Sequence, residues 1–110
     1  MVQAVTASDL PALVSGQTVD LVDVRDADEW QAGHIAGARL VPLEILRADP
    51  DAALARNVPT VFICAKGVRS LQAAKLADRF GYDRVYHLEG GTREWARAGK
   101  ALVVESRAAA

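Results

Sequence analysis

The stretch TVFICAKGVRSLQAAKLADRFG, residues 60–81, decides the fold class. Residues 60–64 are apolar or β-branched, which is typical of a buried strand. From Arg69 to Phe80 the apolar residues recur at helical spacing, and Gly81 follows where a left-handed helix cap belongs. The stretch therefore predicts a buried strand, a short turn and a long helix, which together are a building unit of α/β domains.

The rest of the chain repeats this alternation of strand and helix. Further strands are predicted over residues 19–24 and 84–88, with an edge strand over 102–104. Further helices are predicted over residues 6–15 and 26–31, within 89–99, and as two short helices within 43–56. This order predicts an α/β fold of three layers, in which a mostly parallel sheet is flanked by helices on both faces.

One domain is expected over residues 1–110, because this is a common domain length and no linker or repeat divides the chain. Its core should span about residues 5–104, and the alanine-rich tail beyond should fray. The net charge of −1 gives no strong attraction to nucleic acid or to an anionic membrane. Neither a signal peptide nor a membrane-spanning run is visible, so a cytoplasmic location is expected.

The chain has one cysteine, Cys64, at the carboxyl end of the strand predicted over residues 60–64. A single cysteine forms neither an internal disulfide nor a cysteine-rich zinc site, and no metal or cofactor is expected. Two interpretations of Cys64 are open. It is either a small core residue that ends a strand or a nucleophile presented on a loop. Ligands bind beyond the carboxyl ends of parallel strands, which favours the second interpretation.

The residues after Cys64 favour a reactive thiolate. Gly67 lets the backbone turn with its amides inward, and the helix that follows has N-terminal amides without intrahelical acceptors. Lys66 and Arg69 add positive charge, which favours thiolate over thiol. The amides of five residues are predicted to cradle an anion: Ala65, Lys66, Gly67, Val68 and Arg69. Ser70 is expected to cap the helix or donate its hydroxyl.

Some polar residues outside this loop are candidates for a supporting role. Asp23 and Arg25 lie at the carboxyl end of the strand predicted over residues 19–24, and a structural ion pair between them is favoured over a role at the site. Glu29 is expected to pair with Arg25 or to cap a loop amide. Gly90 and Gly91 are expected to let the backbone approach the cysteine loop closely.

Three segments together resemble the rhodanese family. They are DVRDADEWQAGHIAGARLVP at residues 23–42, CAKGVRS at 64–70 and LEGGTREWARAG at 88–99. Their order and spacing fit the family over nearly the whole chain. The resemblance also implies that His34 lies in a turn, with a ring nitrogen bonded to the backbone.

The resemblance implies a sulfurtransferase with Cys64 as the sulfur carrier. Its thiolate would attack the outer sulfur of a small anionic donor such as thiosulfate, sulfite would leave, and Cys64 would hold a persulfide. The acceptor would be cyanide or a thiol, including a thiol on a protein. Lys66 would attract the dianionic donor, and the loop amides would stabilise the persulfide and the departing anion.

Two alternatives to a sulfurtransferase remain from the sequence. The first is a phosphatase or arsenate reductase of the same fold, with Cys64 and Arg69 taken as a Cys-x5-Arg signature, although related phosphatases have a loop that is one residue longer. The second is a binding or regulatory module without catalysis. Replacing Cys64 with serine separates these classes, because an enzyme loses activity and a docking module keeps its partner.

Overall fold

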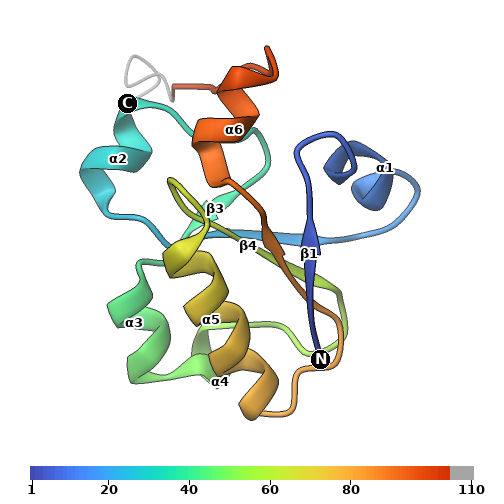
Figure 1. Ribbon diagram of the computed structural model, residues 1–110. Coiled ribbons are helices and arrows are strands. Elements are labelled where there is room, and N and C mark those ends of the chain that lie inside the picture. The colour runs from blue at the N-terminus through green and yellow to red at the C-terminus, as the bar shows by residue number, and fades with distance from the viewer. Residues whose placement is uncertain (105–110) are drawn as a thin grey trace.

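The computed structural model describes residues 1–104. Its strands are β1 (Val2–Val5), β2 (Asp20–Asp23), β3 (Arg39–Leu40), β4 (Thr60–Ile63) and β5 (Val85–Leu88). Its helices are α1 (Leu10–Val14), α2 (Ala27–Ala32), α3 (Leu43–Ala48), α4 (Pro50–Ala53), α5 (Val68–Arg79) and α6 (Gly91–Arg97), as Figure 1 shows. The tail that was expected to fray lies outside the described residues. Within residues 1–104, no helix has the length and apolar character needed to cross a membrane.

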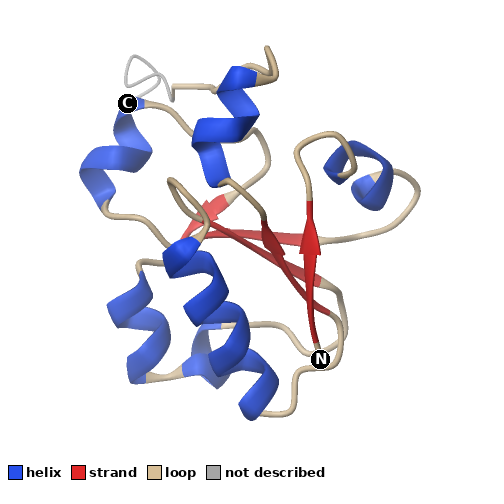
Figure 2. Ribbon diagram, in the orientation of Figure 1, coloured by secondary structure: helices blue, strands red, loops and turns tan. Residues whose placement is uncertain are grey.

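The five strands form one parallel sheet in the order β1-β5-β4-β2-β3 (Figure 2). Strand β4 lies at its centre, and all four of its residues are buried. Side chains on the two faces of β4 enter different apolar clusters, because successive residues of a strand point to opposite faces. The predicted α/β fold with a parallel sheet is therefore confirmed.

Helices cover both faces of this sheet. On one face, Phe62 and Cys64 pack with apolar residues of α3, α4 and α5. On the other face, Val61 and Ile63 pack with residues of α1 and α6. The alternation along β4 therefore places the side chain of Cys64 on the face covered by α5, at the end of the strand where α5 begins.

The structure differs from the sequence-based prediction at both ends of the chain. Strand β1 was not predicted, because only Val5 of its four residues is buried and no apolar run marks it. It lies at the sheet edge and pairs with β5 alone. The predicted edge strand at residues 102–104 is wrong. Only Val103 pairs there, in an isolated antiparallel bridge with His34.

The first turn of α6 lies against the loop that follows β4. The Thr92 amide donates to the carbonyl oxygen of Cys64 at 2.8 Å, and the Arg93 amide donates to that of Ala65 at 3.0 Å. Gly91 makes this approach feasible, since a Cβ atom on it would lie 2.3 Å from the Cys64 carbonyl oxygen. The close approach expected from the glycine pair is thus observed, and it fixes the position of the cysteine loop.

We predict that Gly91→Ala destabilises the protein far more than Gly16→Ala. Both glycines have a positive φ, +60° and +76°, so alanine costs about 1–2 kcal/mol of backbone strain at either position. Only Gly91 adds a clash with backbone atoms, which costs about 1–3 kcal/mol more, because nothing lies within 4 Å of a Cβ on Gly16. Urea unfolding of the two variants measures the difference, and equal losses would contradict the packing role of Gly91.

Candidate active site

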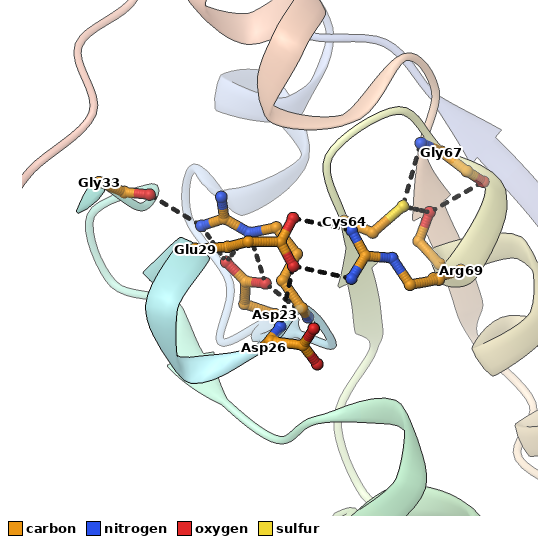
Figure 3. Close-up of polar contacts among 9 residues, drawn as sticks. Asp23, Asp26, Glu29, Gly33, Cys64, Gly67 and Arg69 are labelled. Atoms are coloured by element: carbon orange, nitrogen blue, oxygen red, sulfur yellow. Dashed lines mark hydrogen bonds and ion pairs between the residues drawn. The ribbon is translucent and has the colours of Figure 1, made fainter. Parts of the chain in front are cut away.

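The sulfur of Cys64 accepts a hydrogen bond from the backbone of its own loop (Figure 3). The Gly67 amide donates to Sγ at 3.0 Å, and Sγ lies 3.4 Å from the Ser70 hydroxyl. The Ser70 hydroxyl in turn donates to the Gly67 carbonyl oxygen at 3.1 Å. The Gly67 amide and the Ser70 hydroxyl thus hold Sγ in a defined position within the turn.

Gly67 is required at the turn for two physical reasons. Its φ of +101° is in the region that favours glycine, and it is the residue that caps the start of α5. A Cβ atom at this position would also lie 3.2 Å from the Gly90 amide nitrogen, which is tighter than ordinary contact. The loop therefore turns sharply enough to bring an amide back onto Sγ while it stays packed beneath α6.

Five loop amides were predicted to form an anion cradle. They differ in whether they donate to Sγ and in whether they belong to α5. Among residues 1–104, the amide of Gly67 is the one recorded as donating to Sγ. The amides of Val68 and Arg69 belong to the first turn of α5, where helix geometry provides no intrahelical acceptor. A role of the Ala65, Lys66, Val68 and Arg69 amides in binding an anion stays a prediction.

Cys64 is buried and also borders an open cleft. Its side chain is part of the apolar cluster beneath α5, and the residue is 1% exposed. The cleft has a volume of about 300 Å³, which is at the lower end of the range for small-molecule sites. Its lining residues are Glu29, Cys64, Ala65, Lys66, Val68 and Arg69. The two interpretations of Cys64 are therefore not exclusive, since a packed sulfur forms part of the wall of an accessible site.

The side chain of Arg69 forms a bidentate ion pair with Glu29. Its two terminal nitrogens donate to the two carboxylate oxygens of Glu29 at 2.8 and 2.9 Å. Glu29 Oε1 also accepts from the Asp26 amide at 3.0 Å, which closes the capping box of α2. The hydrogen bonds from Arg69 lower the pKa of Glu29 from 4.5 to about 2, against the opposing effect of burial. The same pair raises the pKa of Arg69.

The Glu29–Arg69 pair was not predicted from the sequence, because its members lie 40 residues apart. The expected amide cap by Glu29 is confirmed, but no hydrogen bond between Glu29 and Arg25 is found among the described residues. One local pattern indicated that Glu29 matters. It is an acidic residue just before Trp30, in a segment that resembles a family motif. Its partner could be named only once the fold brought α2 beside α5.

Asp23 and Arg25 form a buried ion pair. The Arg25 guanidinium donates to both Asp23 carboxylate oxygens at 2.8–3.1 Å and to the Gly33 carbonyl oxygen at 2.8 Å. Both residues are buried, and neither lines the cleft beside Cys64. The contacts match the favoured interpretation of a structural ion pair, and the bond to Gly33 joins the end of β2 to the turn after α2.

His34 has the backbone contact that the resemblance implied. Its Nδ1 lies 2.9 Å from the Trp30 carbonyl oxygen, and its ring stacks on the indole of Trp30 with centroids 3.5 Å apart. Neither ring is part of the cleft lining. This stack packs α2 against the chain that follows it.

The Cys-x5-Arg interpretation is wrong in its spacing. Four residues, 65–68, separate Cys64 from Arg69, and the position that the signature assigns to arginine holds Ser70. Arg69 is also committed to Glu29. The loop therefore lacks a free arginine at the position where a phosphatase would use one to bind phosphate oxygens.

We predict that the stabilising effect of Glu29 disappears as the pH falls. A carboxyl whose pKa is lowered by folding stabilises the protein above its ordinary pKa of 4.5, and this contribution is lost as the pH falls toward about 2. The difference in unfolding free energy between the wild type and Glu29→Gln should therefore be constant near neutral pH and shrink below pH 4.5. In an Arg69→Gln background the same substitution should have little pH-dependent effect. A difference that stays flat in acid would contradict the pairing.

Comparison with known proteins places the chain in a family. The model for the rhodanese-like domain matches residues 6–98. The thiosulfate sulfurtransferase GlpE of Shewanella oneidensis is 33% identical over 98 residues, which cover 84% of this chain and 91% of GlpE. A rhodanese-related protein from Thermoplasma volcanium superposes with a TM-score of 0.84 at 29% identity, covering 94% of this chain and 99% of that one.

Longer proteins also contain a similar segment. The Mycobacterium tuberculosis protein named "Probable adenylyltransferase/sulfurtransferase MoeZ" is 37% identical over 86 residues, which are 77% of this chain and 22% of that protein. This chain thus spans about a fifth of the length of that relative. With a family match over most of its length and GlpE matched nearly end to end, the chain belongs to the rhodanese-like domain family.

Proposed function

We propose that this chain is a sulfurtransferase that carries a sulfane sulfur on Cys64. The observation that carries the proposal is the hydrogen bond from the Gly67 amide to a sulfur that borders a small cleft. That amide stabilises the thiolate needed for attack and stays in place when the negative charge moves to an added sulfur atom. A thiol used in this way has to be kept reduced, as it is in the cytoplasm, where we expect the protein to act.

Loading of sulfur follows from this geometry. The Cys64 thiolate attacks the outer sulfur of thiosulfate, a new S–S bond forms, and the S–S bond of thiosulfate breaks. The bonding electron pair leaves with sulfite. Lys66, which lines the cleft, attracts the dianion, and the amides at the start of α5 donate to the charge that develops on sulfur and oxygen.

Discharge reverses the role of Cys64. A thiolate or cyanide attacks the terminal sulfur of the persulfide, and the Cys64 thiolate leaves. The Gly67 amide then stabilises the negative charge that returns to Sγ. Atoms and electrons balance in both steps with only a donor and an acceptor, so we assign no cofactor to the reaction.

Phosphate transfer is disfavoured as the function of this site. Arg69 is held by Glu29, and Ser70 stands where the signature requires arginine, so residues 64–70 offer no guanidinium placed to bind phosphate oxygens. A pure binding module would need neither an intact cysteine nor an amide directed at its sulfur. A docking role is tested separately below, through a variant that keeps the shape of the site.

We predict that the protein gains the mass of one sulfur atom when it is incubated with thiosulfate. The gain should be absent in Cys64→Ser and should be removed by cyanide, which then appears as thiocyanate. Intact-protein mass spectrometry measures both steps. Serine keeps the size of the side chain, so unchanged thermal unfolding of the variant would exclude misfolding as the cause.

Other outcomes would separate the alternatives. A gain of sulfur in Cys64→Ser would contradict the assignment of the carrier. No gain with thiosulfate or with polysulfide would argue for a binding module. In that case a partner captured by the wild type should bind Cys64→Ser equally well.

We further predict that Lys66→Gln raises the KM for thiosulfate more than it lowers kcat. An exposed charge pair contributes about 0.2–1 kcal/mol, so the expected rise is about 1.4- to fivefold at low ionic strength. Lys75→Gln is the matched control, because Lys75 is exposed on α5 and does not line the cleft beside Cys64, and the substitution removes the same charge. Equal KM values for both variants would contradict a role of Lys66 in binding the donor.

A further inference from the structure

A second open cleft adjoins the first on the α6 side of the cysteine loop. It has a volume of about 350 Å³ and is lined by Lys66, Gly90, Arg93, Glu94 and Arg97. Lys66 lines both clefts, so the two are neighbours that share one residue of the cysteine loop. A molecule bound in the second cleft would therefore lie next to the site of sulfur loading.

This second cleft is strongly positive although the whole chain carries a charge of −1. Arg93 and Arg97 are four residues apart on α6, so they occupy one face about 6 Å apart along the axis. Arg97 Nε lies 3.8 Å from Glu94 Oε2, which is a loose ion pair between two exposed side chains. Within residues 1–104, the side chains of Lys66 and Arg93 form no hydrogen bond or ion pair. Three cations thus face one carboxylate.

A backbone hydrogen bond fixes Arg93 against the cysteine loop. The Arg93 amide donates to the carbonyl oxygen of Ala65, the residue that follows Cys64, at 3.0 Å. The charge of Arg69, at the other side of the loop, is neutralised by Glu29. Positive charge that is free to meet an anion is therefore concentrated between Lys66 and α6.

We propose that this second cleft binds the sulfur acceptor, and that the acceptor is a small thiol bearing a carboxylate. The proposal rests on the sulfurtransferase function and names its second substrate class. The volume suits a small molecule. The carboxylate lies among Lys66, Arg93 and Arg97, while the thiolate reaches the persulfide on Cys64. The thiolate attacks the terminal sulfur, the bond between that sulfur and Sγ breaks, and the products are a small-molecule persulfide and the Cys64 thiolate.

The test compares two thiols that differ only in one charge, N-acetylcysteine and its neutral amide. Protein loaded with one sulfur is freed of donor and mixed with each thiol, and the rate of discharge is expressed per thiolate to correct for different thiol acidities. The persulfide is itself negative, so repulsion alone would favour the amide. We expect the wild type to discharge to N-acetylcysteine about three- to tenfold faster, because each of the three exposed pairs contributes about a 1.4- to fivefold effect.

Substitution of the two α6 arginines tests whether they cause the preference for the charged thiol. Arg93→Gln with Arg97→Gln should bring the ratio of the two rates close to one, and about 1 M salt should do the same for the wild type. Lys75→Gln removes a charge outside the cleft and should keep the wild-type ratio. Unchanged thermal unfolding of the double variant would show that it is folded.

The outcomes distinguish the inference from the function on which it rests. Normal loading of Cys64 together with equal discharge to both thiols would overturn the acceptor site and leave the sulfurtransferase function standing. A preference that survives in the double arginine variant would overturn the role of α6. If neither thiosulfate nor polysulfide loads Cys64, the proposed function fails and the acceptor site fails with it.

Discussion

The cysteine loop depends on the contact between its carbonyl groups and the first turn of α6. Amides of α6 bind the carbonyl oxygens of Cys64 and Ala65, and the missing side chain of Gly91 allows the two backbones to meet. Because these carbonyls are held toward α6, the loop can direct the Gly67 amide at Sγ. Backbone contacts between distant parts of the chain thus orient the amide that donates to Sγ.

The loop is held on its other side by the ion pair between Glu29 and Arg69. This pair joins the start of α5 to α2, which is itself positioned by the capping box at Asp26. It also gives the site its electrostatic asymmetry. The cleft beside α2 contains an arginine neutralised by Glu29, whereas the cleft beside α6 contains three cations and one carboxylate, so the two sides of the cysteine loop differ in charge.

The sequence alone predicted those parts of the fold whose signals are local. The buried strand and long helix expected at residues 60–64 and 69–80 correspond to β4 and α5, because apolar periodicity is strong there. The exposed edge strand β1 has no such signal and was missed. The loop candidates are consecutive in sequence and could be named together. The pairing of Glu29 with Arg69, and the position of the α6 cations beside Lys66, depend on contacts across the fold that a local pattern does not indicate.

The central claim is that backbone amides hold a sulfur atom carried by Cys64. A high-resolution crystal structure of the protein after treatment with thiosulfate tests it most directly. The account predicts density for one extra sulfur bonded to Sγ, within hydrogen-bond distance of the Gly67 amide and of the amides at the start of α5. An extra sulfur that points away from these amides, or an unmodified Cys64 in protein whose mass shows added sulfur, would contradict the account.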